Sequence, residues 1–230
     1  MGIVANNPST QLQIKDAADR LMDALATAAA RVQSGAADAA IRRWFGDDAV
    51  PQKKALANTI SRFRSNINLK TIVVGFEVAK VNPNFSRVAD ANGKVTVISP
   101  KFIRSTGMNA AAFRATDANV SLNLGDRLSH VPVGEAPVEL GEGYKQLPKL
   151  LPQAAGQVDA SGWIQSQFET LVHELSHLLL GTIDVKYTDG STAYGTEQAA
   201  LLATFGSEHS FKNAENWGIF IEAAGIHKTA

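Results

Sequence analysis

Two histidines, a glutamate and an aspartate in the C-terminal half carry the clearest chemistry of this chain. His173 and His177 are four residues apart, so on a helix both imidazoles lie on one face, one turn from each other. A zinc ion can be bound by two such nitrogens, and Glu174, about 100° round the helix, could act on a water without binding the metal. The alternative is a pair of hydrogen-bonded histidines on a core helix.

A catalytic zinc ion usually has three protein ligands and an open position for water. Gly181 would end the helix and let the chain turn back, which brings Asp184 within reach of the metal. The sequence therefore predicts one zinc ion per chain, bound by His173, His177 and Asp184. The rival third ligands, each expected to be a surface or hydrogen-bonded histidine, are His130, His209 and His227.

Residues 161–180 are predicted to form the helix that presents this motif, with Ser161 as its N-cap and Gly181 as its stop. Apolar side chains recur at helical spacing on the opposite face, at Ile164, Phe168, Leu171, Leu175 and Leu178. A hairpin is expected to turn at Asp189-Gly190, because Asp-Gly tolerates the positive φ angles of a tight turn. A last helix is expected from about Lys212.

Helices are predicted before any strand in the N-terminal half, over 9–33, over 35–46 and from Pro51 onward. The β-branched run 71–81 indicates a strand, and Asn92-Gly93 indicates a hairpin between "FSRVAD" and "KVTVIS". A small, mainly antiparallel sheet is thus expected over about 71–103.

Residues 104–160 are predicted to be a loop-rich insertion with one short strand at 120–124, and residues 1–35 a helical extension. Together these elements predict one α+β domain over residues 1–230.

The composition excludes several classes of function. The chain has 230 residues and no cysteine, so it has no thiolate ligand or nucleophile. No run reaches the ~18 apolar residues that span a membrane, and no ordinary signal peptide is visible. The protein is nevertheless expected to be secreted, with a leader removed, or to be delivered by a dedicated export machine. Residues 1–116 carry 16 basic and 8 acidic side chains, and residues 117–230 carry 6 and 14. No basic patch interleaved with aromatics indicates nucleic-acid binding, and the acidic half favours a cationic substrate.

Several motifs resemble those of the aspzincins, the deuterolysin and peptidyl-Lys metalloendopeptidase family. "HELSH" followed by "GTID" resembles the family signature H-E-x-x-H followed by G-T-x-D. "AYG" (193–195) with Leu202-Ala203 and "NAENWGIF" (213–220) resemble its Tyr-Gly, Leu-Ala and N-A-D-N-x-x-x-F motifs. "RWFG" (43–46) and "SPKF" (99–102) are weaker similarities to the family. The chain has no cysteine, so the disulfides of secreted eukaryotic members are missing.

The resemblance implies a zincin-like metalloendopeptidase that hydrolyses peptide bonds. Glu174 would be the general base, and a tyrosine hydroxyl would stabilise the oxyanion. Tyr194 is favoured for this role because its spacing to Leu202 fits the family, and Tyr187 is the alternative. In the predicted hairpin, Tyr194 would lie opposite Val185, next to Asp184. The substrate would lie along an edge strand, at about 94–99.

Lysine-preferring members are similar in two acidic residues on the N-A-D-N-x-x-x-F helix. Here Glu215 matches the first, Gly218 the second, and Glu222 could partly substitute, so a weak preference for lysine after the scissile bond is predicted. We expect a monomer that acts on a protein or peptide. The alternatives are a zinc hydrolase toxin or effector with one dedicated or non-peptide substrate, and a binding module with a vestigial metal site.

Overall fold

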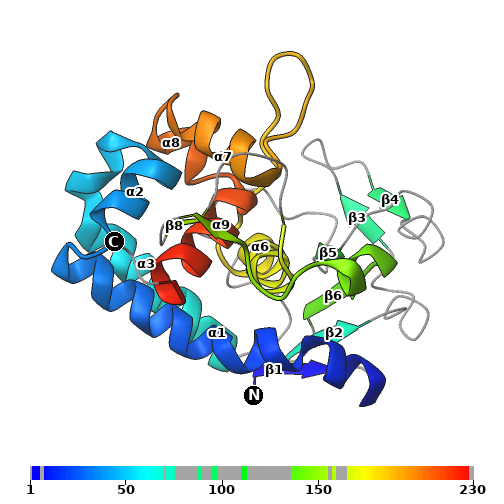
Figure 1. Ribbon diagram of the computed structural model, residues 1–230. Helices are drawn as coiled ribbons and strands as arrows, with labels where there is room; N and C mark the ends of the chain where they lie inside the picture. The colour runs from blue at the N-terminus through cyan, green and yellow to red at the C-terminus, as the bar shows by residue number, and fades with distance from the viewer. Residues whose placement is uncertain are drawn as a thin grey trace.

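The computed structural model describes residues 2–5, 8–69, 71–75, 87–89, 95–97, 110–112, 136–154, 157–158 and 165–227. Most helices gather on one side and the main sheet lies on the other, with α6 (Gln167–Leu179) between them, seen end-on at the centre of Figure 1. None of the helices in these ranges has the length and apolar character that a membrane crossing demands.

The predicted N-terminal helices are present as α1 (Pro8–Ser34), α2 (Asp38–Phe45) and α3 (Lys53–Leu69). Pro51 lies inside a 3₁₀ helix, η1 (Asp47–Gln52), so α3 begins two residues later than predicted. Buried residues recur along α1 at helical spacing and form the face that packs against α3 and against the last helix of the chain. The N-terminal extension therefore belongs to the same core as the C-terminal half.

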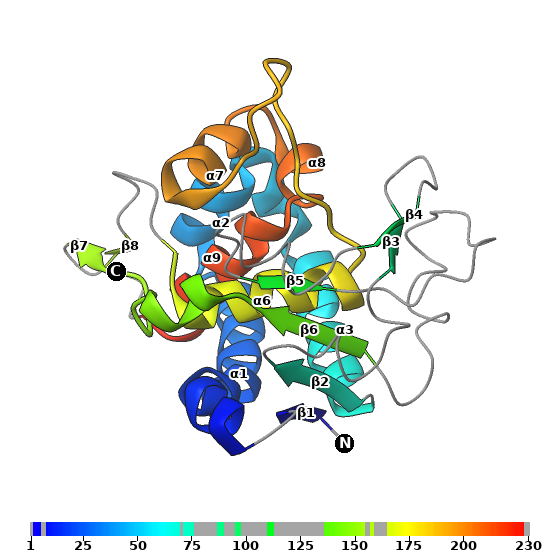
Figure 2. The same ribbon diagram turned by 90° about the vertical axis from the view of Figure 1, so that its right-hand side faces the viewer.

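The main sheet differs from the mainly antiparallel sheet predicted. It has four strands in the order β1 (Gly2–Ala5), β2 (Thr71–Gly75), β6 (Ala136–Leu140) and β5 (Ala110–Ala112), stacked in that order in Figure 2. β1 pairs with β2 and β2 with β6 in parallel, and only β5 with β6 is antiparallel. Three helices separate β1 from β2, and a long crossover of this kind returns the chain to the same end of the sheet.

The remaining strands lie in two small hairpins. β3 (Arg87–Ala89) and β4 (Val95–Val97) pair antiparallel with Arg87 opposite Val97, so this predicted pairing is confirmed, and β7 (Gln153–Ala154) pairs with β8 (Gln157–Val158). The described residues of the predicted loop-rich insertion hold β5, β6, β7, β8 and the 3₁₀ helix η3 (Glu142–Gln146), none of which was predicted. The expected turn at Asn92-Gly93 and the expected strand segments 76–81 and 120–124 lie outside the described residues.

The metal-motif helix α6 begins at Gln167 and is capped by Ser166, whose hydroxyl accepts a hydrogen bond from the Glu169 backbone N–H at 2.9 Å. The predicted cap at Ser161, itself outside the described residues, was therefore five residues too early. α6 is buried nearly all round, because α9 (Ala214–Gly225) covers one side and β5 and β6 cover another. Two shorter helices, α7 (Gly195–Ala203) and α8 (Ser207–Ser210), precede α9, which begins two residues after the predicted start.

Candidate metal centre

Three ligand atoms converge where α6 meets the loop that follows it. The Nε2 atoms of His173 and His177 are 3.1 Å apart, and Oδ1 of Asp184 lies 3.2 Å from each of them. Both histidines come from α6 at the predicted one-turn spacing, and the chain reaches Asp184 because Gly181 adopts a positive φ of 73° just after the helix. The structure thus brings together the three residues predicted as ligands.

The donor set and its spacing fit a zinc ion. Tetrahedral zinc with ligands at 2.0–2.1 Å separates neighbouring ligand atoms by about 3.3 Å, close to the separations found here. The Nδ1 atom of His177 donates to the Thr182 carbonyl at 2.8 Å, and Nδ1 of His173 donates to a carboxylate oxygen of Glu215 at 2.9 Å. In neutral imidazoles this leaves each Nε2 with a lone pair that points to the shared centre.

The electrostatics of the site favour a cation among these atoms. The buried Oδ1 of Asp184 accepts no well-directed hydrogen bond from the described residues. Burial alone would raise the pKa of Asp184, but the two imidazoles outweigh it and hold that pKa well below its usual range. Burial would lower the pKa of His173, but Asp184 and Glu215 outweigh it and raise that pKa well above its ordinary value. The carboxylates therefore attract positive charge to this centre, and a metal ion bound there would supply that charge.

The loop that carries Asp184 is fixed to the start of α9. The Ile183 N–H donates to the Lys212 carbonyl at 2.8 Å, and the Ile183 carbonyl accepts the Ala214 N–H at 3.0 Å. The Asn213 side chain accepts the Val185 N–H at 3.0 Å. Hydrogen bonds on both sides of Asp184 thus hold the third candidate ligand in place, and Lys212, Asn213 and Ala214 at the start of α9 supply them.

Tyr194 lies at the metal centre and Tyr187 does not. The Tyr194 ring centre is 5.9 Å from that of His173. Burial raises the pKa of Tyr194 well above its ordinary value, and the charge of Asp184 and its hydrogen bond with the Tyr194 hydroxyl add to the increase. Tyr187 instead donates to the Gln198 carbonyl at 2.7 Å and packs against Phe205. The predicted turn about Asp189-Gly190 is present, with Gly190 at φ 86°.

The register of this hairpin differs by one residue from the prediction. Lys186 is bridged to Thr192, and the Ala193 N–H donates to the Val185 carbonyl at 2.9 Å. Ala193 therefore takes the place opposite Val185 that was predicted for Tyr194, and this register places Tyr194 opposite Asp184 itself.

One of three comparisons with known proteins found a similar fold. No protein-family model matches the chain, and no curated protein matches it. Among solved structures, the zinc peptidase from Grifola frondosa is similar with a TM-score of 0.56 and 19% sequence identity, over 96% of this chain and 99% of that one. The chain has the fold of that zinc peptidase. At this identity the likeness shows the fold alone, and that fold agrees with the architecture that the sequence motifs implied.

On this zinc-peptidase fold, the acidic residues predicted to bind lysine have other partners. Glu215 is fully buried and accepts hydrogen bonds from His173 and from the Gly195 N–H, the latter at 2.6 Å. Glu222 is also fully buried and accepts from Ser166 at 2.5 Å and contacts His227 at 3.1 Å. Neither carboxylate is open to a substrate ammonium, so the structure does not support this use of the two residues.

Gly218, the third residue of that prediction, lets α9 approach α6 closely. A Cβ atom on Gly218 would lie 2.5 Å from Oε1 of Glu169 and 2.8 Å from its carbonyl oxygen. Glu169 is fully buried, and burial together with the negative charge of Glu215 raises its pKa well above the ordinary value. Its Oε1 lies 3.9 Å from Nδ1 of His173.

The other residues discussed from the sequence lie as follows. Glu174 is 5% exposed, and its negative charge acts on both His173 and Tyr194. His209 pairs with Glu208 on the surface at 3.2 Å, and His227 pairs with Glu222, so neither lies with the ligand group. His130 is outside the described residues.

Sequence reasoning missed Glu169 and the contact between Glu215 and His173. The first had a signal, because Ser166-x-x-Glu169 is a capping-box pattern that marks the true start of the helix. The second depends on how α9 packs on α6, which no local pattern specifies.

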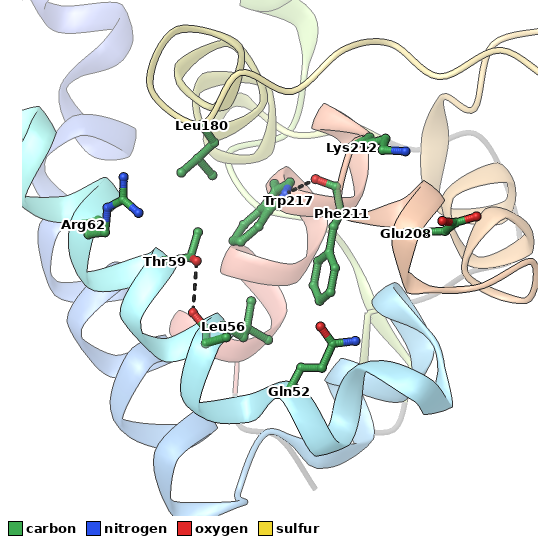
Figure 3. A pocket seen from close by; sticks show the side chains of 10 residues that line it. Gln52, Leu56, Thr59, Arg62, Leu180, Glu208, Phe211, Lys212 and Trp217 are labelled. Atoms are coloured by element: carbon green, nitrogen blue, oxygen red, sulfur yellow. Dashed lines mark hydrogen bonds between the residues drawn. The ribbon is translucent and has the colours of Figure 1, made fainter. Parts of the chain in front are cut away.

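A separate hollow lies between α3, α8 and the end of α6 and holds none of the metal-site residues (Figure 3). It has a volume of about 570 Å³. Leu56, Leu180, Phe211 and Trp217 form its apolar part, with charged side chains at the rim. Leu180 lies directly before Gly181, so this side of the hollow adjoins the turn that leads to Asp184.

Proposed function

We propose that this protein is a zinc metalloendopeptidase. The single observation that carries the proposal is the trio of ligand atoms 3.1–3.2 Å apart on His173, His177 and Asp184, in a chain with the fold of a zinc peptidase. When bound there, zinc supplies Lewis-acid polarisation of a scissile carbonyl and of a water molecule.

The residues around the metal position supply the proton transfers. Glu174 adjoins the first ligand on α6 and is nearly buried, so it can take a proton from the attacking water and later deliver it to the leaving amine. We assign the oxyanion donor to Tyr194, because burial and Asp184 keep its hydroxyl protonated and it lies beside the ligands. Tyr187 is assigned no catalytic part, since its hydroxyl is bound to Gln198.

The preference for lysine after the scissile bond remains a prediction from the resemblance. Glu215 and Glu222 do not support it in their present contacts, because both are buried and hydrogen-bonded. We therefore propose endopeptidase activity without a lysine pocket built from these two carboxylates.

Metal analysis and peptide cleavage test the proposal together. We expect one zinc ion per chain and cleavage within an unbiased peptide library, and Glu174→Gln should keep its zinc but lose turnover by about 10²–10⁴-fold. Protein that binds no zinc after zinc addition, or a Glu174→Gln variant with nearly full activity, would contradict it. A zinc-loaded wild type that cleaves no peptide would instead indicate a different hydrolase substrate.

A further inference from the structure

One buried carboxylate, that of Glu215, touches two separate parts of the candidate site. Oε2 of Glu215 accepts the Nδ1–H of His173 at 2.9 Å, and Oε1 accepts the backbone N–H of Gly195 at 2.6 Å. Gly195 follows Tyr194 directly and is the first residue of α7. We infer that Glu215 is a positioning residue that sets both the zinc ligand His173 and the proposed oxyanion donor Tyr194, an inference that rests on the proposed function.

The contact with His173 determines which imidazole nitrogen faces the metal. A carboxylate only accepts, so Nδ1 must carry the hydrogen and Nε2 must carry the lone pair. Such a carboxylate also fixes the ring plane and makes the imidazole a more basic ligand. His177 obtains the same orientation from the Thr182 carbonyl, which its own loop provides. On α6 itself, Oε1 of Glu169 lies 3.9 Å from Nδ1 of His173, beyond hydrogen-bond distance, so His173 depends on Glu215 of α9.

The contact with Gly195 determines where Tyr194 sits. The Gly195 N–H lies in the first turn of α7, where backbone donors have no acceptor within the helix and a negative charge is favourable. Gly195 has a φ of 79°, and Tyr194 precedes it in an extended conformation. Because the Gly195 N–H is held by Glu215, the position of Tyr194 just before α7 is held as well. One side chain therefore holds both partners in register with each other.

Only a residue with two equivalent acceptor oxygens fits between these two donors. Glutamine has the same length, but it offers one oxygen and one NH₂ group, so at least one N–H would face another donor. In a site that is fully buried, water cannot repair that mismatch. Aspartate keeps two oxygens on a stem that is one carbon shorter, so it should restore part of the effect.

Glu222 provides a matched control on the same helix. Both glutamates are 0% exposed and hydrogen-bonded, but the partners of Glu222 are Ser166, Leu151 and His227, none of which is a proposed ligand. Glu222→Gln thus reproduces the loss of a buried carboxylate on α9 without touching His173 or Gly195.

Zinc affinity is the first measurement, by competition with a chromophoric chelator. Glu215→Gln should raise the zinc Kd by about 10–100-fold, Glu215→Asp by less, and Glu222→Gln by less than twofold. The visible spectrum of the cobalt-substituted protein should change for Glu215→Gln and not for Glu222→Gln. If Glu215→Gln does not fold, Glu215→Asp carries the test.

The second measurement is a double-mutant cycle of Glu215→Gln with Tyr194→Phe at saturating zinc. If Glu215 also positions Tyr194, its effect on kcat should shrink once the hydroxyl is removed, so the two effects are not multiplicative. The inference would be overturned if a folded Glu215 variant had the zinc Kd and the cobalt spectrum of the wild type. That result would leave the proposed function intact, because the wild-type protein would still bind zinc. Wild-type protein without zinc would overturn the proposed function instead.

Discussion

Gly218→Ala tests the close approach of α9 to α6 that underlies the metal centre. The added Cβ would lie 2.5 Å from Oε1 of Glu169 and 2.8 Å from its carbonyl oxygen, both well inside van der Waals contact. Because one of these atoms is backbone, the helices must separate, which places the cost near the upper end of the 1–3 kcal/mol typical of overpacking. Alanine offsets about 1 kcal/mol of this loss in stability, because it has a higher helix propensity than glycine.

The expected net loss is therefore about 2 kcal/mol in the free energy of unfolding, or a decrease of about 4–8 °C in Tm for a domain of this size. Urea unfolding followed by circular dichroism measures the first, and a thermal scan the second. Since the shift displaces α9 from the helix that holds His173, the zinc Kd should also rise.

Gly225→Ala is the matched comparison on the same helix. Its Cβ would lie 2.5 Å from the Ala24 carbonyl oxygen, so it forces α9 away from α1 rather than from α6. We expect a similar loss of stability with little change in zinc affinity. Gly218→Ala protein with wild-type stability, within about 0.5 kcal/mol, would show that the two helices do not approach so closely.

Four further outcomes are expected. Asp184→Ala should lower zinc affinity strongly and His209→Ala should not, as chelator competition would show; the reverse would exclude Asp184 as third ligand. Tyr194→Phe should lower kcat by about 10²–10³-fold at unchanged zinc content, whereas Tyr187→Phe should change it little, and the opposite order would refute our assignment of the hydroxyl. Hydrogen bonds from Ser207 lower the pKa of Asp48 in the folded protein. The ionised Asp48 carboxylate therefore stabilises the fold above pH ~3.8, and this stabilisation is lost as the pH falls through the lowered pKa. Asp48→Ala should thus be less stable than wild type at neutral pH and no longer so in acid, as parallel unfolding curves can test. Library cleavage should show at most a weak enrichment of lysine after the cut, and a strong enrichment would indicate that Glu215 or Glu222 does bind the substrate lysine.

The local signals in the sequence predicted the ligand group well. His173 and His177 needed only a helix and a spacing of four, and Gly181 and Asp184 needed only a turn that glycine permits. The Asp189-Gly190 turn was predicted for the same reason, since a tight turn restricts its own residues. Its register was wrong by one residue because period-two patterns in a short hairpin do not specify which residues pair.

The sheet could not be predicted in the same way. β1 at Gly2–Ala5 and β6 at Ala136–Leu140 are short, and they become strands because β2 lies between them as a common partner. Partners so distant in sequence leave no local pattern. The same holds for Glu215, whose position on α9 indicated a solvated or substrate-facing acid until the packing placed it against His173.

His173 and Glu215 are 42 positions apart in the sequence, which has a consequence for the order in which the protein folds. During synthesis the three ligands leave the ribosome before the segment that orients the first of them and anchors the third. Until α9 docks on α6, the zinc position lacks both its rigid geometry and the tyrosine beside it. Under the proposed function, zinc binding and the docking of α9 are thereby linked, so zinc would stabilise the chain only once α9 is in place. Under the proposed function, the chain would gain peptidase activity only after α9 has docked, so an unfinished chain would not cleave the unfolded chains around it.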